Sequence, residues 1–251
     1  SVVALWLMSM VLLFSKSKSG ISMILSFIGT LIIGGFITLL WIELERPPMR
    51  TLGETRLWYS FFLPCIGLIT FRKWRYSWFL QYALLLAIVF MTINMLKPET
   101  HEKTLMPALQ SIWFVPHVIV YIFSYALLAA SSLVAIHGLY VLQKFKRNSL
   151  DILLADNLVY AGFSFLTLGL IFGALWAKEA WGDYWTWDPK ETWALISWLC
   201  YLLYIHFRIH DNKKIKTALL ILSVSFVFLL ICWFGLNYLP TAQNSVHTYN
   251  Q

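Results

Sequence analysis

Apolar residues run along this chain in long blocks that short polar stretches separate. The blocks cover residues 2–14, 21–42, 57–71, 78–96, 116–142, 157–176, 189–207 and 218–236. A bilayer core about 30 Å thick needs roughly 20 apolar residues in a helix, and most blocks approach that length. The blocks at 2–14 and 57–71 are short, and Pro64 in the second favours a kink or a place inside the bundle. The pattern predicts an all-α, polytopic transmembrane helix bundle of about eight spans, forming a single integral-membrane domain over residues 1–251.

The composition excludes several classes of protein. Hydrophobic residues make up 59% of the chain and charged residues only 12%, whereas average globular chains are about 25% charged. This balance excludes a soluble protein, a disordered protein and a nucleic-acid-binding domain. Cys65, Cys200 and Cys232 lie scattered in apolar stretches without a CxxC pair, which argues against a disulfide framework, a zinc site and a dithiol redox centre.

Basic residues predict the orientation in the lipid bilayer. The connections after the first, third, fifth and seventh blocks hold 12 Lys and Arg, and the other three connections hold 7. Because cytoplasmic loops carry the excess of Lys and Arg, both termini and the connection before residue 189 are expected outside. The chain starts at Ser1 without Met, which predicts a truncated N-terminus or part of a longer fusion. A signal peptide is the alternative, but residues 1–14 have neither a basic start nor a small-residue cleavage site.

Residues 176–193, WAKEAWGDYWTWDPKETW, form the most distinctive stretch of the sequence. Asp188, Pro189 and Glu191 match the N-cap, first and third positions of a capped helix. Capping does not explain the aromatic residues before it, which include Trp181, Tyr184, Trp185 and Trp187. An interfacial aromatic belt is one interpretation. Their density, with Gly182 permitting a tight bend, favours a platform on which a flat aromatic ligand stacks.

Histidines in membrane helices indicate functional sites, because an intramembrane polar group is costly. His117 follows Pro116 at the expected outer start of its helix, and His247 lies in the outer tail. Two imidazoles beside an aromatic platform are what a bis-histidine haem site needs. The alternative for His247 is a free tail residue.

Two further histidines are expected near the cytoplasmic side. His206 lies 17 residues past Pro189, about 26 Å along a helix, and His137 lies 20 residues past His117, about 30 Å along its helix. These positions allow a second, inner site. The alternative for His137 and His210 is an interfacial histidine, and His101, in the polar stretch KPETHEK, is expected in solvent.

The stretch WGDYWTWDPKETWALISWL resembles the tryptophan-rich "WWD" signature of membrane proteins that handle haem in cytochrome c biogenesis. DPKETWAL, followed by the helix with His206, resembles the CcsA/ResC family of system II. The resemblance extends to His117 in PALQSIWFVPHVIVYIFSYALL and to His247, and it covers the chain from about residue 45 onward.

The resemblance implies a cytochrome c synthase of the haem lyase type. With a CcsB/ResB-type partner, separate or fused, such a protein carries haem b from the cytoplasmic side to an outer site. There it presents the haem to the CxxCH motif of apocytochrome c. His117 and His247 match the family's outer axial ligands of the haem iron, and His206 matches its intramembrane histidine. The family's other intramembrane histidine belongs to the CcsB portion, so the inner site is expected to be incomplete in this chain.

The chemistry implied is addition of the two substrate thiols across the haem vinyl groups, so no catalytic side chain of its own is expected. The haem-binding set is His117, His247, His206, Trp181, Tyr184, Trp185, Trp187, Asp188, Arg50 and Arg56. Arg46, Arg50 and Arg56 suit the two haem propionates because guanidinium groups bind carboxylates in a bidentate manner. The alternative for them is ordinary loop charge.

The family's membrane is the bacterial inner membrane or the plastid thylakoid, with the WWD loop and C-terminus on the periplasmic or lumenal side. Other functions stay open. A CcmC-like haem-delivery protein shares the WWD signature but makes no thioether, and the DPKET ending, the eight blocks and the tail histidine argue against it. A small-molecule transporter with an aromatic vestibule is expected to show inverted repeats or broken helices, and the sequence shows neither. A structural membrane subunit would be colourless, whereas a haem protein shows a Soret band.

Overall fold

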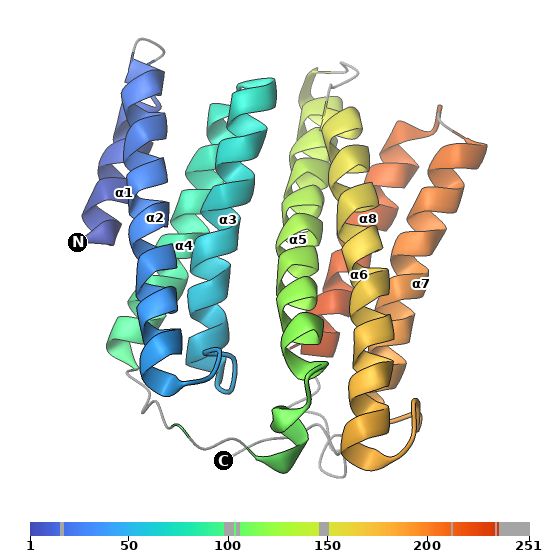
Figure 1. The fold of residues 1–251 in the computed structure, drawn as a ribbon. Helices are drawn as coiled ribbons and strands as arrows, with labels where there is room; N and C mark the ends of the chain where they lie inside the picture. Colours follow the sequence, from blue (N-terminus) through green and yellow to red (C-terminus); the bar gives the residue numbers. More distant parts are fainter. Residues whose placement is uncertain are drawn as a thin grey trace. The chain divides into compact units, whose positions relative to one another are not determined.

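The protein is described by a computed structural model that covers residues 1–15, 18–97, 103, 106–145, 151–211, 213–233 and 235, and its described elements are all helical (Figure 1). The helices are α1 (Val2–Leu12), α2 (Ser19–Leu44), α3 (Leu52–Trp74), α4 (Ser77–Leu96), the 3₁₀-helix η2 (Pro107–Gln110), α5 (Phe114–Phe145), α6 (Asp151–Trp181), α7 (Pro189–His210) and α8 (Ile215–Trp233). The chain divides into two compact units, Ser1–Gln110 with α1 to α4 and Ser111–Gln251 with α5 to α8. The all-helical prediction is confirmed.

Within the described residues, six helices are long and apolar enough to cross a membrane, namely α2, α4, α5, α6, α7 and α8. Helix α1 is apolar but has only 11 residues. Helix α3 has 23 residues, with charged side chains in its first and last turns. The transmembrane helix bundle is therefore borne out, and the number of eight spans stays a prediction.

Helix α3 is longer than the apolar block 57–71 predicted. The Thr51 hydroxyl caps its start by accepting a hydrogen bond from the Glu54 amide at 3.1 Å, and this adds a polar first turn. The apolar block begins only at residue 57, because Glu54 and Arg56 are charged and a hydropathy pattern does not count them as part of a membrane helix. Pro64 lies buried within the continuous helix, as expected for a residue that packs inside the bundle.

Small polar residues join α1 to α2 in the first unit. The Ser9 hydroxyl contacts the Ser22 and Ser26 hydroxyls at 2.7 and 2.6 Å. The indole of Trp6, fully buried, lies against Gly29, where a Cβ would meet it at 2.5 Å. Lipid tails are as apolar as leucine, so close approach and hydrogen bonds of this kind hold membrane helices together.

A buried ion pair fixes the α2–α3 connection. The Arg46 guanidinium donates to both carboxylate oxygens of Glu54 at 2.9 and 2.8 Å, and their side chains are 4% and 0% exposed. The Arg50 amide donates to the same carboxylate. The Arg56 Nε donates to Asn94 on α4 at 2.6 Å. Arg46 and Arg56 thus have structural contacts of their own, and the role of Arg50 and Arg56 toward haem propionates stays a prediction.

Glu54→Ala is expected to destabilise the first unit by about 3–5 kcal/mol, because removing one partner leaves the other charge buried without compensation. Equilibrium unfolding of the detergent-solubilised protein measures this loss. Glu45→Ala is the matched control. The hydrogen bond and charge of Lys103 lower the pKa of Glu45, but both side chains are mostly exposed, so little change is expected. Equal losses in the two variants would contradict the role of the buried pair.

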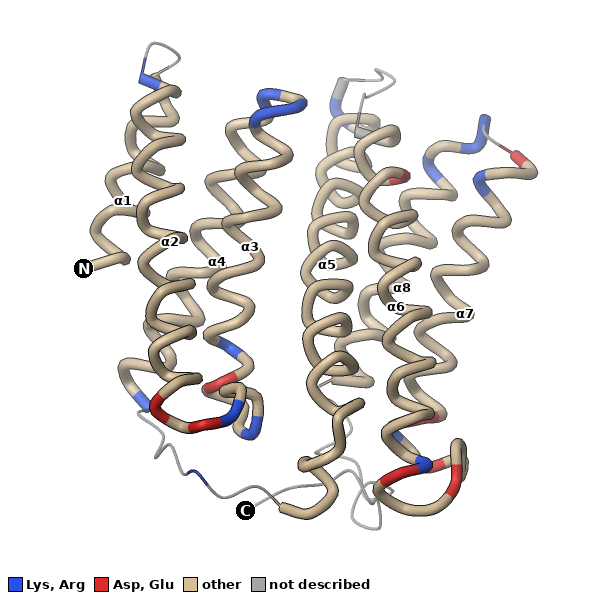
Figure 2. The backbone as a smooth tube through the Cα atoms, viewed as in Figure 1, with Lys and Arg blue, Asp and Glu red and all other residues tan. Residues whose placement is uncertain are grey.

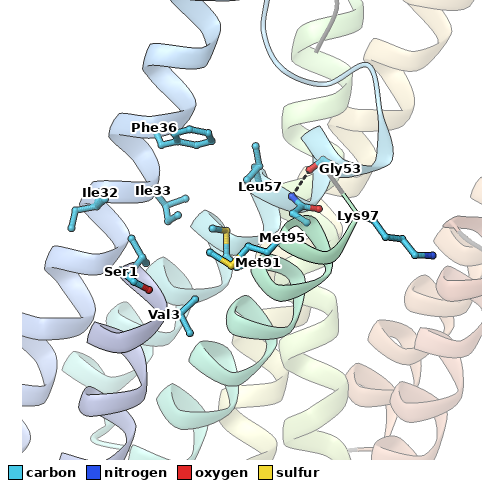
Figure 3. Close-up of a pocket in the computed structure, with 12 residues that line it drawn as sticks. Ser1, Val3, Ile32, Ile33, Phe36, Gly53, Leu57, Met91, Met95 and Lys97 are labelled. Carbon is cyan, nitrogen blue, oxygen red and sulfur yellow. Dashed lines mark hydrogen bonds between the residues drawn. The ribbon is translucent and has the colours of Figure 1, made fainter. Parts of the chain in front are cut away.

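The first unit contains an apolar cavity of about 430 Å³. Its walls come from α1 to α4 and include Ile33, Phe36, Leu57 and Met91 (Figure 3). The Asn94 amide at its edge donates to the Gly53 carbonyl at 2.9 Å. The lining contains no histidine, so none of the predicted iron ligands belongs to this cavity.

Helices α5 and α6 pack closely in the second unit because α6 carries glycines on the face toward α5. The Ser124 hydroxyl donates to the Gly162 carbonyl at 2.7 Å. At the α7–α8 end, Arg208 and the Tyr204 hydroxyl both donate to Asp156, at 2.8 and 2.7 Å, which ties α7 to α6. These contacts fix which face of α7 is turned toward the bundle.

Charges are distributed unevenly between the two ends of the second unit (Figure 2). The end with the α7–α8 connection carries five described basic residues, Lys144, Arg208, Lys213, Lys214 and Lys216, and three acidic ones, Asp151, Asp156 and Asp211. The end with the α6–α7 connection carries Lys178 and Lys190 among four acidic residues, Glu179, Asp183, Asp188 and Glu191. By the positive-inside rule this supports the predicted outer location of the α6–α7 connection, which stays a prediction.

Candidate functional site

The connection between α6 and α7 is shorter than the sequence predicted. Helix α6 continues to Trp181, so Trp176 and Trp181 lie on its last turns and not in the loop. The chain then bends at Gly182, whose φ of 94° is a conformation that favours glycine. The Lys178 ammonium donates to the Gly182 carbonyl at 2.6 Å, which stabilises this bend. The aromatic loop proper is therefore 182–188.

The predicted capping box at the start of α7 is confirmed. Asp188 accepts from the Lys190 amide at 2.9 Å, and Glu191 accepts from the Asp188 amide at 3.1 Å. The Glu191 carboxylate also accepts from the Thr186 amide at 2.8 Å. These bonds anchor the second half of the loop to α7, so the aromatic residues before Asp188 are attached to a rigid element.

Three loop aromatics form the outward part of the predicted platform. Tyr184 and Trp187 are 56% and 68% exposed. Trp185 is half-buried, and its ring lies 5.8 Å from that of Trp187 at nearly a right angle. Trp187 has a φ of 60°, which costs a residue with a Cβ roughly 1–2 kcal/mol. The loop holds a large indole outward at this cost, as expected of a surface that grips a ligand.

The helical tryptophans form a separate, inward cluster. Trp176 is 5% exposed, and its ring lies 4.9 Å from Trp181, 5.3 Å from Phe114 and 5.3 Å from His117. The single platform that the sequence suggested is therefore divided. Trp176 contacts the histidine, whereas Tyr184, Trp185 and Trp187 lie in the loop.

His117 lies near the start of α5, against α6. Its Nδ1 is 2.9 Å from the Gly169 carbonyl oxygen. A carbonyl can only accept, so Nδ1 carries a proton, and in the neutral ring the lone pair is then on Nε2. A neutral imidazole with this tautomer is a metal ligand through Nε2, and the Nδ1–H bond orients it. The structure thus brings His117 together with Trp176 and Trp181, which the sequence had placed on the same side.

The other predicted ligands are placed differently. His247, like His101, lies outside the described residues. His206 is exposed on α7, and its Nδ1 donates to the Leu202 carbonyl at 3.0 Å. Tyr204 and Arg208 on α7 face α6 through Asp156, and successive helical residues are about 100° apart, so His206 lies on the opposite face. His137 is half-buried on α5. Within the described ranges, no three His, Cys, Asp or Glu residues form a group that could hold a metal ion.

The sequence interpretation missed three residues of this site. Tyr121 lies with its ring 4.6 Å from that of His117, edge to face. Gly169 and Gly173 supply the surface of α6 on which these rings lie. The spacing of four between the two glycines was the available signal, since it predicts one face of a helix.

Trp181→Ala, Trp185→Ala and Trp187→Ala are each expected to weaken haem retention, because each removes contact area worth of order 1 kcal/mol or more. The triple variant is expected to insert into membranes but to purify with much less haem, measured by the Soret absorbance per protein. Trp193→Ala is the control, because that ring stacks on Phe228 of α8. A triple variant with full haem would reduce these residues to an interfacial belt.

The fold and the site together define a polytopic helical membrane protein in which His117 is held in an aromatic cluster at one end of a helix bundle. A sequence profile described as "Cytochrome C assembly protein" matches residues 1–242. The chain belongs to this cytochrome c assembly family, within the group of its CcsA relatives.

Three relatives are all described as cytochrome c biogenesis protein CcsA. That of Chlamydomonas reinhardtii is 39% identical over 176 residues, covering 66% of this chain and 49% of the relative. Those of Cuscuta reflexa and Pelargonium hortorum are 32% and 30% identical, covering 90% and 86% of this chain and 83% of each relative. The match thus spans about half of the first relative and about five sixths of the other two.

A solved structure described as cytochrome c heme lyase CcmF has the same fold. The TM-score is 0.73 at 17% identity, and the match covers 93% of this chain and 45% of that chain. At this identity the likeness concerns the fold, and it supports the helical bundle independently of the sequence relatives.

Proposed function

We propose that this protein binds haem b and presents it for covalent attachment to the CxxCH motif of apocytochrome c. It would act as a holocytochrome c synthase of system II together with a CcsB/ResB-type membrane partner, separate or fused. Membership of the cytochrome c assembly family supports the general process. The observation that carries the haem assignment is the His117 imidazole, whose Nδ1 donates to the Gly169 carbonyl and whose ring packs against Trp176 beside the aromatic loop.

At the outer site His117 and His247 are the proposed axial ligands of the haem iron. Trp181, Tyr184, Trp185 and Trp187 would hold the ring, Asp188 would fix the loop through its cap, and Arg50 and Arg56 would bind the propionates. The incoming CxxCH histidine would replace one axial imidazole, which brings both substrate thiols near the vinyl groups.

The bond-forming step needs no side chain of this protein as a nucleophile. Each substrate S–H adds across one vinyl C=C, so a C–S bond and a C–H bond form and no electrons are gained or lost overall. The protein contributes position and axial ligation. Cys65 and Cys200 lie within helices, and the burial of Cys232 argues against a role for its thiol in the reaction.

The proposed inner site uses His206 as one axial ligand of the haem iron. His206 lies about 26 Å along α7 from the aromatic loop. Its place on the face opposite Tyr204 and Arg208 suits a haem shared with another chain, and the CcsB/ResB-type partner would supply the second ligand. Haem would then move across the bilayer of a bacterial inner membrane or a plastid thylakoid. The aromatic loop and the C-terminus would lie on the periplasmic or lumenal side.

The second candidate is CcmC-like haem delivery, in which haem is handed over without thioether formation. The shared WWD stretch favours it. The test is co-purified protein and partner with an apocytochrome c, followed by denaturing electrophoresis and haem peroxidase staining. Synthesis predicts haem covalently bound to a CxxCH substrate and none on an SxxSH variant. Haem transfer without any covalent product would leave delivery as the function.

A further inference from the structure

We propose that Gly169 and Gly173 of α6 form a cradle that positions the His117 ring and directs its Nδ1–H to the Gly169 carbonyl, so that Nε2 is the nitrogen that would bind the haem iron. This inference rests on the proposed role of His117 and names residues that determine how that role is performed. The two glycines are positioning residues, because they would act on the iron only through the imidazole.

A side chain at either glycine would collide with an aromatic ring. A Cβ at Gly173 would lie 2.8 Å from Cε1 and 2.9 Å from Nδ1 of His117. A Cβ at Gly169 would lie 2.9 Å from Cδ2 of Tyr121. These three atoms belong to rings that aromatic neighbours hold in place and not to the ends of flexible chains. Glycine is therefore required at both positions for the rings to approach the backbone of α6 this closely.

The Gly169 carbonyl also determines which ring nitrogen is protonated. It accepts a hydrogen bond from the Nδ1–H of His117, although in a regular helix the amide of residue 173 bonds to the same oxygen. A carbonyl has two acceptor lone pairs, but a ring can reach the second only where no side chain covers the helix surface. The absence of a side chain at Gly173 provides this access. The hydrogen bond to the Gly169 carbonyl therefore depends on glycine at position 173.

Aromatic neighbours also hold the imidazole ring from its other directions. Trp176, one turn after Gly173 on α6, lies at 34° to the imidazole, and Tyr121 contacts it edge to face. The imidazole thus has a fixed plane before haem arrives, and a preorganised ligand loses less conformational freedom on binding. In this arrangement Trp176 is a neighbour of the histidine and not part of the surface that stacks on haem.

The test compares Gly173→Ala with Gly162→Ala in the full protein with its partner. A Cβ at Gly162 would meet a neighbour at a similar distance, 2.7 Å from the Leu128 Cδ2 methyl, but it lies three turns away along α6. Gly173→Ala is expected to lower outer haem affinity by about 10- to 100-fold, as for other groups that orient metal ligands. The remaining haem should show less low-spin signal and a shifted reduction potential. Gly162→Ala should keep the spectrum and potential, even where it lowers thermal stability.

Two further measurements separate positioning from general damage. In the haem-free protein, ¹⁵N NMR of the imidazole should report the Nδ1–H tautomer, and Gly173→Ala should lose it. In a His117→Gly background supplied with imidazole, adding Gly173→Ala should cost little, because no tethered ring remains to be misplaced.

The outcomes are distinct. A Gly173→Ala protein with wild-type spectrum, potential and tautomer overturns the cradle, and so does a Gly162→Ala protein with equal spectral change. If His117→Gly itself leaves the outer haem unchanged, the ligand assignment in the proposed function fails instead. If His117→Gly removes the haem signal while Gly173→Ala is silent, the cradle alone is wrong.

Discussion

Replacing His117 by glycine is expected to abolish cytochrome c assembly and the low-spin spectrum of the outer haem, the largest effect predicted for this protein. The His117 imidazole lies against Trp176, which contacts Trp181. Its Nε2 is the nitrogen that would bind iron. Added imidazole should restore part of both signals by filling the vacated axial position. Haem staining of the matured cytochrome and absorbance of the purified protein measure the two effects.

A glycine in the first turns of α5 also costs helix stability, roughly 1 kcal/mol. Val118→Gly carries the same backbone cost next to the site without removing the imidazole, so it separates the two causes. The same loss and the same rescue are expected for His247→Gly, a residue outside the described range. If His117→Gly and His247→Gly both mature cytochrome c normally with unchanged spectra, the axial assignment is wrong.

The sequence predicted best those elements that depend only on residues near one another in the chain. The length of the apolar blocks located α2, α4 and α7 to within a few residues. The Asp188–Glu191 capping box is correct in detail, because a helix cap depends on neighbours along the chain. The end of α6 was missed. Trp181 continues the helix until Gly182 can bend the chain, and an aromatic-rich sequence gives no local signal for this difference.

The sequence named part of the candidate site but not its contacts. Counting charges placed His117 and the tryptophans on one side, and in the second unit it is Trp176 that contacts His117. The Gly169 carbonyl that orients the imidazole is a backbone atom 52 residues away in sequence. The spacing of Gly169 and Gly173 indicates one face of α6, but no side-chain pattern pairs that face with His117. The Arg46–Glu54 pair was missed for the same reason, because a tertiary contact decides whether a loop arginine faces a ligand or a carboxylate.

Replacing His206 by alanine is expected to starve the outer site of haem without altering the ligation of the haem that arrives. Helix α7 is continuous from Pro189 to His210, so His206 and the aromatic loop lie near opposite ends and cannot bind one iron. The measurement is the rate and extent of outer haem loading at fixed haem supply, with the low-spin spectrum as the second readout. His210→Ala, one turn further along α7, is the matched control and should load normally. A His206→Ala protein that loads the outer site at the wild-type rate would contradict the inner site.

The position of His206 on α7 bears on which residue supplies the second ligand of the inner iron. The partner is the expected source, because His206 lies on the exposed face of α7, away from α6. His137 of α5 is the alternative within the chain. If the partner supplies the ligand, a partner-free preparation should lack the inner bis-histidine spectrum, and His137→Ala should change nothing in the complete assembly. If His137 supplies it, the spectrum should survive without the partner and disappear in His137→Ala. The placement of His206 therefore predicts that removing the partner and removing His206 have the same consequence, an outer site that is intact but empty.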